Sequence, residues 1–284
     1  MADGPIVDIH AHAFPDELAA RIVGPMAAEA GVPAAHAGTV GSLRESMKRA
    51  GIALSVLMPV ATKPEQVRSV NRWAIEQNAA IGAARGIMSF GAMHPRLDDA
   101  VAEIHRLADA GVQGVKFHPD YQHFRPDDEA MAPLYEAFVE RDMIVLYHCG
   151  KDLSVPPPVM GTPERILAVH ERFPTLRLIC AHFGGYEMWD EVETTLLGKD
   201  VWLDTSYTVG PSETSARLPD ERLVRMIRRH GVERVLFGTD TPWDDQLKEV
   251  EAFRRLPLTD DEREAIFGLN AMALLGLDTL PEAE

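Results

Sequence analysis

The stretch Ile6-Val7-Asp8-Ile9-His10-Ala11-His12 sets the fold of this sequence. It begins as an apolar run of the kind that forms a buried parallel strand, and it ends in two histidines. Side chains alternate between the two faces of a strand, so His10 and His12 project from the same face. Two imidazoles on one face are suited to bind a divalent metal ion. A solvated histidine pair at a strand end is the competing interpretation, and the later strands decide between the two.

Length and composition limit the class of protein. The chain has 284 residues and is 46% hydrophobic, which is enough to bury a full-sized core. No apolar run approaches the roughly 20 residues that cross a bilayer, and residues 1–5 show no secretion signal, so we expect a cytoplasmic protein. The formal net charge of −16 argues against nucleic acid and membrane surfaces as partners. We expect a small-molecule substrate instead.

Short apolar runs alternate with amphipathic stretches along the whole sequence. Eight apolar runs have the length of buried strands: 6–12, 53–60, 86–93, 112–118, 143–149, 176–182, 201–206 and 235–239. Helical spacing of apolar residues marks the stretches 41–51, 64–83, 97–110, 129–141, 163–173, 187–198, 220–230, 245–255 and 260–275. Parallel strands need helical crossovers, so eight strands alternating with helices over about 250 residues predict a (β/α)8 TIM barrel, an α/β fold.

A doubly wound open sheet is the alternative α/β architecture. Such a sheet would carry a Gly-rich phosphate turn after its first strand, where this sequence has His-Ala-His. The segment 13–40 is the longest departure from the alternation, and we expect a helix-containing cap there. No linker divides the chain, so we predict a single domain over residues 1–284, with a helical insertion after the first strand.

Residues that bind metals or transfer protons follow most of the apolar runs. In a barrel the C-terminal ends of the strands converge on one mouth, where the active site lies. The side chains at these ends are, in chain order, His10, His12, His94, Lys116, His118, His148, His182 and Asp240. A single histidine would more often be a hydrogen-bonded core residue, but the ordered series indicates a metal-dependent active site.

Three histidines and one carboxylate form the predicted donor set for a catalytic metal. The residues predicted to hold the ion are His10, His12, His148 and Asp240. Zn²⁺ is the first choice for such donors, with Mn²⁺ and Fe²⁺ as alternatives. The ion lowers the pKa of a bound water toward 7, which makes hydroxide available at neutral pH. His182 is predicted to transfer protons, and Asp240 to bind the metal, to activate the water, or to do both.

Lys116 has three interpretations at the same mouth. As a cation it would bind a carboxylate or oxyanion of the substrate, and as a carbamate it would bridge two metal ions. An outward lysine that covers the barrel rim is the third. His118 lies two residues further along the same strand face, and Trp243 follows the last strand. We therefore predict that Lys116, His118 and Trp243 contact a small anionic substrate.

The ordered motifs resemble the amidohydrolase superfamily, in the branch that includes aminocarboxymuconate-semialdehyde decarboxylase. The motifs that carry the resemblance are Asp8-Ile9-His10-Ala11-His12, Gly114-Val115-Lys116-Phe117-His118-Pro119, His148, Ala181-His182-Phe183-Gly184-Gly185 and Gly238-Thr239-Asp240, with a closing helix at 270–277. The resemblance implies a TIM barrel with one metal ion, usually zinc, on the four predicted ligands, and it makes His182 the catalytic histidine. In binuclear relatives a carbamylated lysine on the strand of Lys116 bridges two ions. Members are often dimers, so the resemblance also allows a homodimer.

The first functional prediction is a metal-dependent hydrolase, in which metal-activated water attacks an amide, ester or lactone carbonyl. The alternative is a non-oxidative decarboxylase or hydratase that acts on a small carboxylic acid at the same metal site. A metal-free binding barrel is a remote third possibility, because the ligand set is intact. The same residue types serve all these reactions, so they do not identify the substrate.

Overall fold

The structure is a computed structural model that describes residues 4–280. Contacts between Cα atoms divide the chain into two compact units: the first lies within Met1–Leu57, Ala83–Met88 and Asp204–Glu284, and the second within Met58–Gly82 and Ser89–Leu203. The single domain over residues 1–284 stays a prediction. No helix within residues 4–280 is both long and apolar enough to cross a membrane.

The first unit contains the strand predicted from the opening motif. This strand, β1 (Ile6–Ala11), pairs in parallel with β2 (Ile52–Leu57), and every residue of both is buried. Next to β1 runs β9 (Val235–Leu236) with the residues that follow it, and Ile9 N–H donates to the Phe237 carbonyl at 2.9 Å. The C-terminal end of β1 is therefore held between two neighbouring segments of backbone.

The insertion after β1 forms a helix, as predicted. Within 13–40, α1 (Asp16–Ala30) ends at Gly31, whose φ of 69° glycine adopts without strain. That this helix caps a barrel end stays a prediction. The other helices of the first unit are α2 (Val40–Ala50), η2 (Ala83–Arg85), α9 (Asp220–His230), η4 (Val232–Arg234), α10 (Gln246–Arg254), α11 (Asp260–Glu264), the π-helix η5 (Ala265–Leu269) and α12 (Asn270–Leu275).

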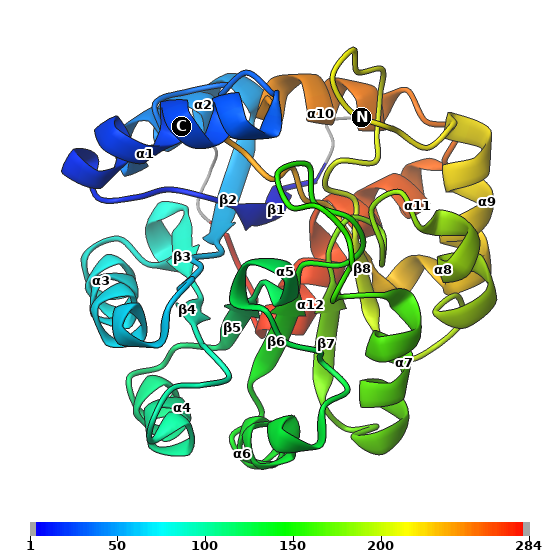
Figure 1. Ribbon diagram of the computed structural model, residues 1–284. Coiled ribbons are helices and arrows are strands. Elements are labelled where there is room, and N and C mark those ends of the chain that lie inside the picture. The colour runs from blue at the N-terminus through cyan, green and yellow to red at the C-terminus, as the bar shows by residue number, and fades with distance from the viewer. Residues whose placement is uncertain (1–3, 281–284) are drawn as a thin grey trace. The chain divides into compact units, whose positions relative to one another are not determined.

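The second unit is a series of parallel strands in chain order (Figure 1). The strands are β4 (Gly91–Ala92), β5 (Gly114–Phe117), β6 (Ile144–Tyr147), β7 (Arg177–Cys180) and β8 (Trp202–Asp204), of which the last residue belongs to the first unit. The register aligns Lys116 with Leu146 and Tyr147 with Cys180. The helices are η1 (Pro64–Gln66), α3 (Val67–Ala80), α4 (Ala100–Asp109), α5 (Pro119–Gln122), η3 (Glu129–Met131), α6 (Ala132–Glu140), α7 (Pro163–Arg172) and α8 (Trp189–Thr195).

The strand predicted at 86–93 is divided into two, β3 (Ile87–Ser89) and β4, so a continuous strand is wrong here. Side-chain amides of α3 take the place of strand partners. Asn78 accepts from Ser89 N–H at 2.7 Å and donates to its carbonyl at 2.9 Å, and Asn71 accepts from Ala92 N–H at 2.7 Å. Buried backbone groups that are satisfied in this way no longer need a β ladder.

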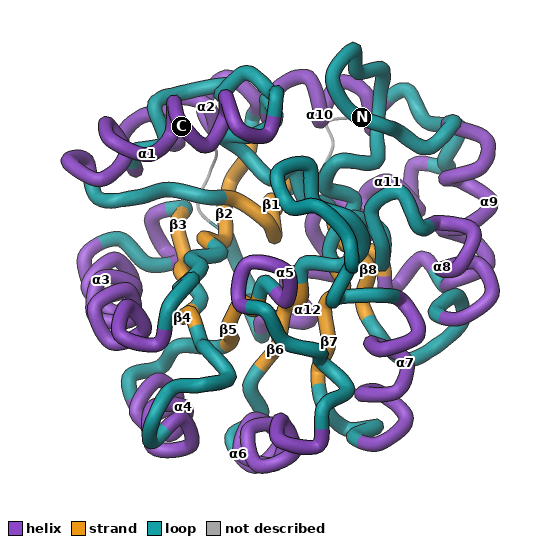
Figure 2. Tube along the Cα trace, in the orientation of Figure 1, coloured by secondary structure: helices purple, strands orange, loops and turns teal. Residues whose placement is uncertain are grey.

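Aromatic clusters lie in the cores of both units. In the first unit Phe237, Phe253 and Phe267 contact one another, with ring centroids 4.9–5.6 Å apart. In the second unit Phe117 stacks on Tyr147 at 5.4 Å. Both units consist of parallel strands joined through helices, which is the α/β class predicted from the sequence. Functional side chains follow these strands, and residues 148–162 after β6 run as a loop (Figure 2).

Candidate functional site

His10 and His12 meet Asp240 at the end of β1, within the first unit. Two backbone hydrogen bonds join the segments: Asp240 N–H donates to the His10 carbonyl at 2.7 Å, and His12 N–H donates to the Thr241 carbonyl at 2.6 Å. This pairing brings the Asp240 carboxylate to the imidazoles, with its Oδ1 3.3 Å from His10 Nε2 and 2.9 Å from His12 Nε2. The structure thus brings together three of the four predicted metal ligands.

The turn that carries Asp240 has a constrained backbone. Asp240 has a φ of 63°, in the left-handed region that residues other than glycine rarely adopt, and Trp243 N–H donates to its carbonyl at 3.0 Å. Gly238 is closely packed against the first strand, because a Cβ there would lie 3.1 Å from the Cβ of His10, so a side chain would push against this histidine. Strained backbone of this kind gathers at functional sites, where the surrounding structure holds it.

Asp204, at the end of β8, orients His10, and it was not among the predicted site residues. Its Oδ2 accepts a hydrogen bond from His10 Nδ1 at 2.9 Å, and both side chains are buried. Ser206 fixes the carboxylate in turn, since its hydroxyl donates to Asp204 Oδ1 at 2.5 Å. The proton on Nδ1 leaves the lone pair of His10 on Nε2, the atom that faces Asp240. A carboxylate inside the apolar run 201–206 was the signal available in the sequence.

We expect Asp204→Asn to weaken metal binding by about 10- to 100-fold, the usual effect of losing a carboxylate that orients a ligating histidine. An amide retains the shape but not the negative charge that favours the Nδ1–H form. Competition with a chelator measures the dissociation constant. The exposed Asp200→Asn is the matched control, and an unchanged dissociation constant in Asp204→Asn would contradict this role for Asp204.

Asp8 links β1 to the segment after β9. Its fully buried carboxylate accepts from Thr239 N–H at 3.0 Å, from the Thr239 hydroxyl at 2.6 Å and from Gln246 Nε2 at 2.7 Å. Burial raises the pKa of Asp8 to about 6, although these hydrogen bonds and that from His10 N–H act in the opposite direction. Asp8 therefore fixes the backbone that carries the two histidines and Asp240.

The donor set of the first unit fits a divalent metal ion. One donor atom from each of His10, His12 and Asp240 forms a close group, and Asp240 Oδ1 lies 3.3 Å from His10 Nε2 and 2.9 Å from His12 Nε2, separations that one ion at about 2.0–2.2 Å from each donor can bridge. The Nδ1 bond of His10 to Asp204 gives the tautomer that such an ion needs. Two imidazoles and a carboxylate suit Zn²⁺, Mn²⁺ and Fe²⁺.

In the second unit, His148 and His182 follow the adjacent strands β6 and β7 and share a hydrogen bond. His182 Nε2 lies 3.0 Å from His148 Nδ1, and both rings are buried. His182 has a φ of 57°, and Trp189 Nε1 donates to its carbonyl at 3.1 Å. A hydrogen bond between two imidazoles holds one proton between them, which suits a group that transfers protons. Metal binding by His148 and proton transfer by His182 stay predictions.

His118 pairs with a carboxylate that was not predicted, Asp152 of the loop after β6. The two groups lie 3.2 Å apart between Nε2 and Oδ2, and Asp152 Oδ1 accepts from the Ser154 N–H and hydroxyl, both at 2.7 Å. Burial raises the pKa of Asp152, but the hydrogen bonds from His118 and Ser154 outweigh it and bring the pKa to about 2. The loop after β6 is thereby attached to the end of β5.

His118, His148 and Asp152 lie close enough together for a metal ion, but the orientation of the rings argues against one shared ion. The two imidazoles stack with centroids 4.0 Å apart and planes 14° from parallel. The lone pair of an imidazole nitrogen lies in the ring plane, so stacked rings direct their lone pairs side by side and not toward one point. We interpret this group as a hydrogen-bonded cluster.

Lys116 is 1% exposed and lies on β5. Its neighbours in register are Ala92 on one side and Leu146 on the other. The interpretation of Lys116 as an outward lysine that covers the barrel rim is therefore wrong. The substrate-binding cation and the metal-bridging carbamate both remain, because each uses a lysine held away from water.

Trp243, a predicted substrate contact, adjoins a buried charged cluster in the first unit. Its carbonyl accepts from the Tyr207 hydroxyl at 2.8 Å, and the Arg217 guanidinium lies over the Tyr207 ring at 4.5 Å. Asp244 pairs with Arg217, and Glu249 Oε1 lies 4.0 Å from Arg217 Nη2. Substrate binding by Trp243 stays a prediction.

Glu249→Gln is expected to stabilise the protein at alkaline pH. Burial, followed by the negative charge of Asp244, raises the pKa of Glu249 well above 4.5. The folded state therefore favours the protonated form of Glu249. The stability that this side chain contributes is lost as the pH rises above 4.5, the ordinary pKa of a glutamate. Glutamine carries no such penalty, so its Tm should exceed that of the wild type by a few degrees at pH 8 and by less near pH 5. Thermal unfolding of both proteins at the two pH values measures this difference in Tm. The exposed Glu251→Gln is the matched control, and a difference in Tm that does not depend on pH would contradict the prediction.

Solved structures show the fold class of the chain. An uncharacterised TIM-barrel protein from Bordetella bronchiseptica is 20% identical, with 96% of this chain and 99% of that one covered and a TM-score of 0.75. The 2,6-dihydroxybenzoate decarboxylase from Rhizobium is 17% identical, with coverage of 97% and 99% and a TM-score of 0.72. The dihydroxybenzoic acid decarboxylase from Polaromonas sp. JS666, solved with manganese and the inhibitor 2-nitroresorcinol, is 17% identical, with coverage of 97% and 98% and a TM-score of 0.73. These likenesses confirm the predicted (β/α)8 TIM-barrel fold.

The sequence profile of the amidohydrolase family matches residues 7–277, nearly the whole chain. The chain belongs to the amidohydrolase family and is an enzyme of that type, as the resemblance implied. Among curated proteins, none matches this sequence.

Proposed function

We propose that this enzyme is a metal-dependent, non-oxidative decarboxylase of a small carboxylic acid. The observation that carries the proposal is the convergence of His10, His12 and Asp240 at the end of β1, with His10 oriented by Asp204. The likeness to two dihydroxybenzoate decarboxylases supports decarboxylation over the hydrolysis predicted first. The Polaromonas enzyme was solved with manganese, so we place Mn²⁺ beside Zn²⁺ as the candidate ion.

A divalent ion held here would bind anionic oxygens of the substrate and stabilise the negative charge left when carbon dioxide departs. His10 and His12 would hold it through Nε2, and Asp240 through a carboxylate oxygen. In the reaction the bond between carbon and carboxylate breaks, carbon dioxide leaves, and a proton joins the carbon. We assign delivery of that proton to His182, with His148 Nδ1 as its hydrogen-bond partner. Lys116 would neutralise an anionic part of the substrate.

Hydrolysis of an amide, ester or lactone is the second candidate. Asp240 favours it, because a carboxylate beside the two imidazoles that would hold the metal could also accept a proton from a water activated there. The two reactions differ in their products: decarboxylation releases carbon dioxide, whereas hydrolysis opens the substrate at its carbonyl.

The test is a substrate panel on the purified enzyme with its metal content measured in parallel. Carboxylated phenols, including 2,6-dihydroxybenzoate, would be assayed for carbon dioxide release, and lactones, esters and amides for hydrolysis. We expect metal-dependent release of carbon dioxide and none after treatment with a chelator. Hydrolysis without carbon dioxide release would overturn the proposal in favour of the second candidate, and activity that survives complete metal removal would overturn both.

A small anionic substrate, a homodimer and a cytoplasmic location stay predictions. So does the metal count of one ion, or two if Lys116 is carbamylated. Native mass spectrometry of the purified enzyme would determine the number of protomers and ions together, and the mass of a carbamate would identify the state of Lys116.

A further inference from the structure

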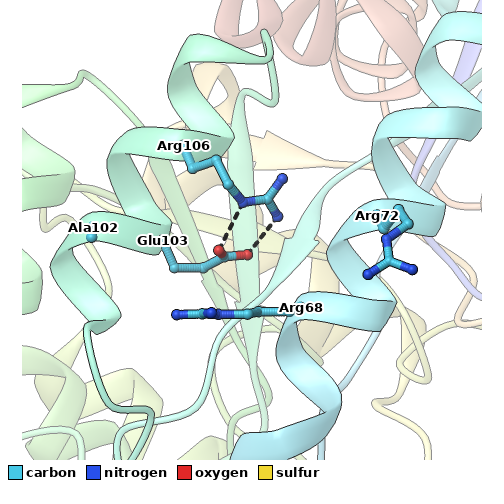
Figure 3. Close-up of a pocket in the computed structure, with 5 residues that line it drawn as sticks. All are labelled: Arg68, Arg72, Ala102, Glu103 and Arg106. Atoms are coloured by element: carbon cyan, nitrogen blue, oxygen red, sulfur yellow. Dashed lines mark hydrogen bonds and ion pairs between the residues drawn. The ribbon is translucent and has the colours of Figure 1, made fainter.

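A basic pocket lies between α3 and α4 of the second unit (Figure 3). Its volume is about 390 Å³, within the range of small-molecule sites, and it is lined by Arg68, Arg72, Ala102, Glu103 and Arg106. Arg68 and Arg72 are one helical turn apart on α3, and Arg106 is one turn after Ala102 on α4. None of these residues takes part in the candidate metal site.

Positive charge exceeds negative charge in this pocket, although the whole chain has a net charge of −16. Three guanidinium groups and one carboxylate line it, which leaves a surplus of two positive charges. Asp99 approaches Arg68 Nη2 only at 4.0 Å, is 76% exposed and does not line the pocket. A concentration of arginine in an acidic protein would attract a multiply charged anion.

One of the three arginines is fixed in place by a buried carboxylate. Glu103 is 3% exposed at its side chain and accepts from Arg106 Nε at 2.8 Å and Nη2 at 2.7 Å. Figure 3 shows this pair above the Arg68 side chain, which reaches across from α3. The paired contact leaves Arg106 Nη1 outside the bond to Glu103, so a rigid guanidinium is presented to the pocket.

The same carboxylate connects the pocket to a strand. Asn71 Nδ2 donates to Glu103 Oε1 at 2.6 Å, while Asn71 Oδ1 accepts from Ala92 N–H on β4 at 2.7 Å. Ala92 is in register with Lys116 on β5. A ligand that moves Arg106 would therefore alter a continuous set of hydrogen bonds that ends at the Ala92 amide.

We propose that this pocket binds a phosphoryl group, either as free phosphate or as the phosphate ester of a small molecule. The charge of a phosphate dianion equals the surplus of two, and guanidinium groups bind phosphate oxygens through paired N–H donors. The proposed decarboxylation needs no phosphoryl group, so the ligand would be an effector and not a substrate.

The experiment is calorimetric titration of the metal-loaded enzyme with inorganic phosphate and with glucose 6-phosphate at constant ionic strength. We expect saturable binding of one equivalent. The double variant Arg68→Ala/Arg72→Ala should weaken it by about tenfold or more, because it removes two charge-assisted contacts. Arg225→Ala, which removes an exposed arginine of α9, is the matched control and should bind as the wild type does.

His12→Ala separates this pocket from the metal site, since phosphate also binds metal ions. Binding that is retained in His12→Ala and weakened in the double arginine variant supports the pocket. Tighter binding of glucose 6-phosphate identifies an ester as the ligand class, and equal binding identifies free phosphate. No saturable binding to the wild type, or binding lost in His12→Ala but unchanged in the double arginine variant, would overturn the proposal whatever reaction the enzyme catalyses.

Discussion

Replacing His12 with alanine is expected to remove bound metal and turnover together. His12 Nε2 lies 2.9 Å from Asp240 Oδ1, so its loss leaves a single imidazole and the carboxylate as donors in the first unit. Losing a direct ligand should exceed the 10- to 100-fold effect of losing an orienting group, so we expect a decrease of at least about 100-fold in metal affinity. Elemental analysis after gel filtration measures the metal, and the substrate identified by the panel measures turnover.

His105→Ala is the matched control for this variant. His105 lies on α4, 3.3 Å from Arg141 through Nδ1, and belongs to neither candidate site. It should keep both metal and turnover, and circular dichroism of both variants would establish that they fold. If His12→Ala retained a full equivalent of metal, the assignment of the β1 histidines as ligands would be wrong.

The approach of His10 and His12 to Asp240 was predictable from the sequence, because it depends on the alternation of side chains along a strand and on where the apolar runs end. Two histidines two residues apart share a strand face, and parallel strands end at the same edge. Thr239 and Asp240 directly follow an apolar run, so this carboxylate was expected near the histidines. Buried strands and amphipathic helices give strong signals of this kind. The helix within 13–40 was correctly expected on a different ground, because the segment interrupts the alternation of strands and helices and is rich in alanine.

The partners of the predicted residues were not predictable in the same way. Asp204 and Asp152 contact histidines 194 and 34 residues away in sequence, and the sequence around each aspartate does not indicate which histidine is its partner. The break in the strand 86–93 has a similar cause, because Asn78 on a preceding helix satisfies the backbone of Ser89. Such contacts depend on tertiary distances that periodicity does not contain.

The residue types in the site also do not determine which reaction it catalyses. Imidazoles and a carboxylate around a divalent ion serve hydrolysis through a bound water and decarboxylation through a bound substrate oxygen. Both predictions therefore used the same residues, and the solved decarboxylases, not His10 or Asp240, favour the second. The two reactions differ in proton transfer. Decarboxylation delivers a proton to the carbon that loses carbon dioxide, whereas hydrolysis takes a proton from the attacking water.

Replacing His182 with glutamine or alanine tests this proton transfer directly. Both variants are expected to keep the metal while turnover falls by about 10²- to 10⁴-fold, the usual contribution of a general acid or base. Glutamine is the sharper variant because His182 bonds to His148 through Nε2, a position that the amide of glutamine can reach and the shorter asparagine cannot. Neither replacement titrates near neutral pH.

The two variants distinguish a proton donor from a structural hydrogen-bond partner. If His182 only positioned His148, glutamine would restore most of the turnover that alanine loses. If His182 delivers the proton, both variants lose turnover alike and the pH dependence of kcat loses the limb that belongs to the imidazole. His170→Ala, on α7 of the same unit, is the control that should leave metal, turnover and pH profile unchanged. Turnover near the wild-type level in His182→Gln would therefore show that His182 does not deliver the proton and would make His148 the next candidate for the proton donor.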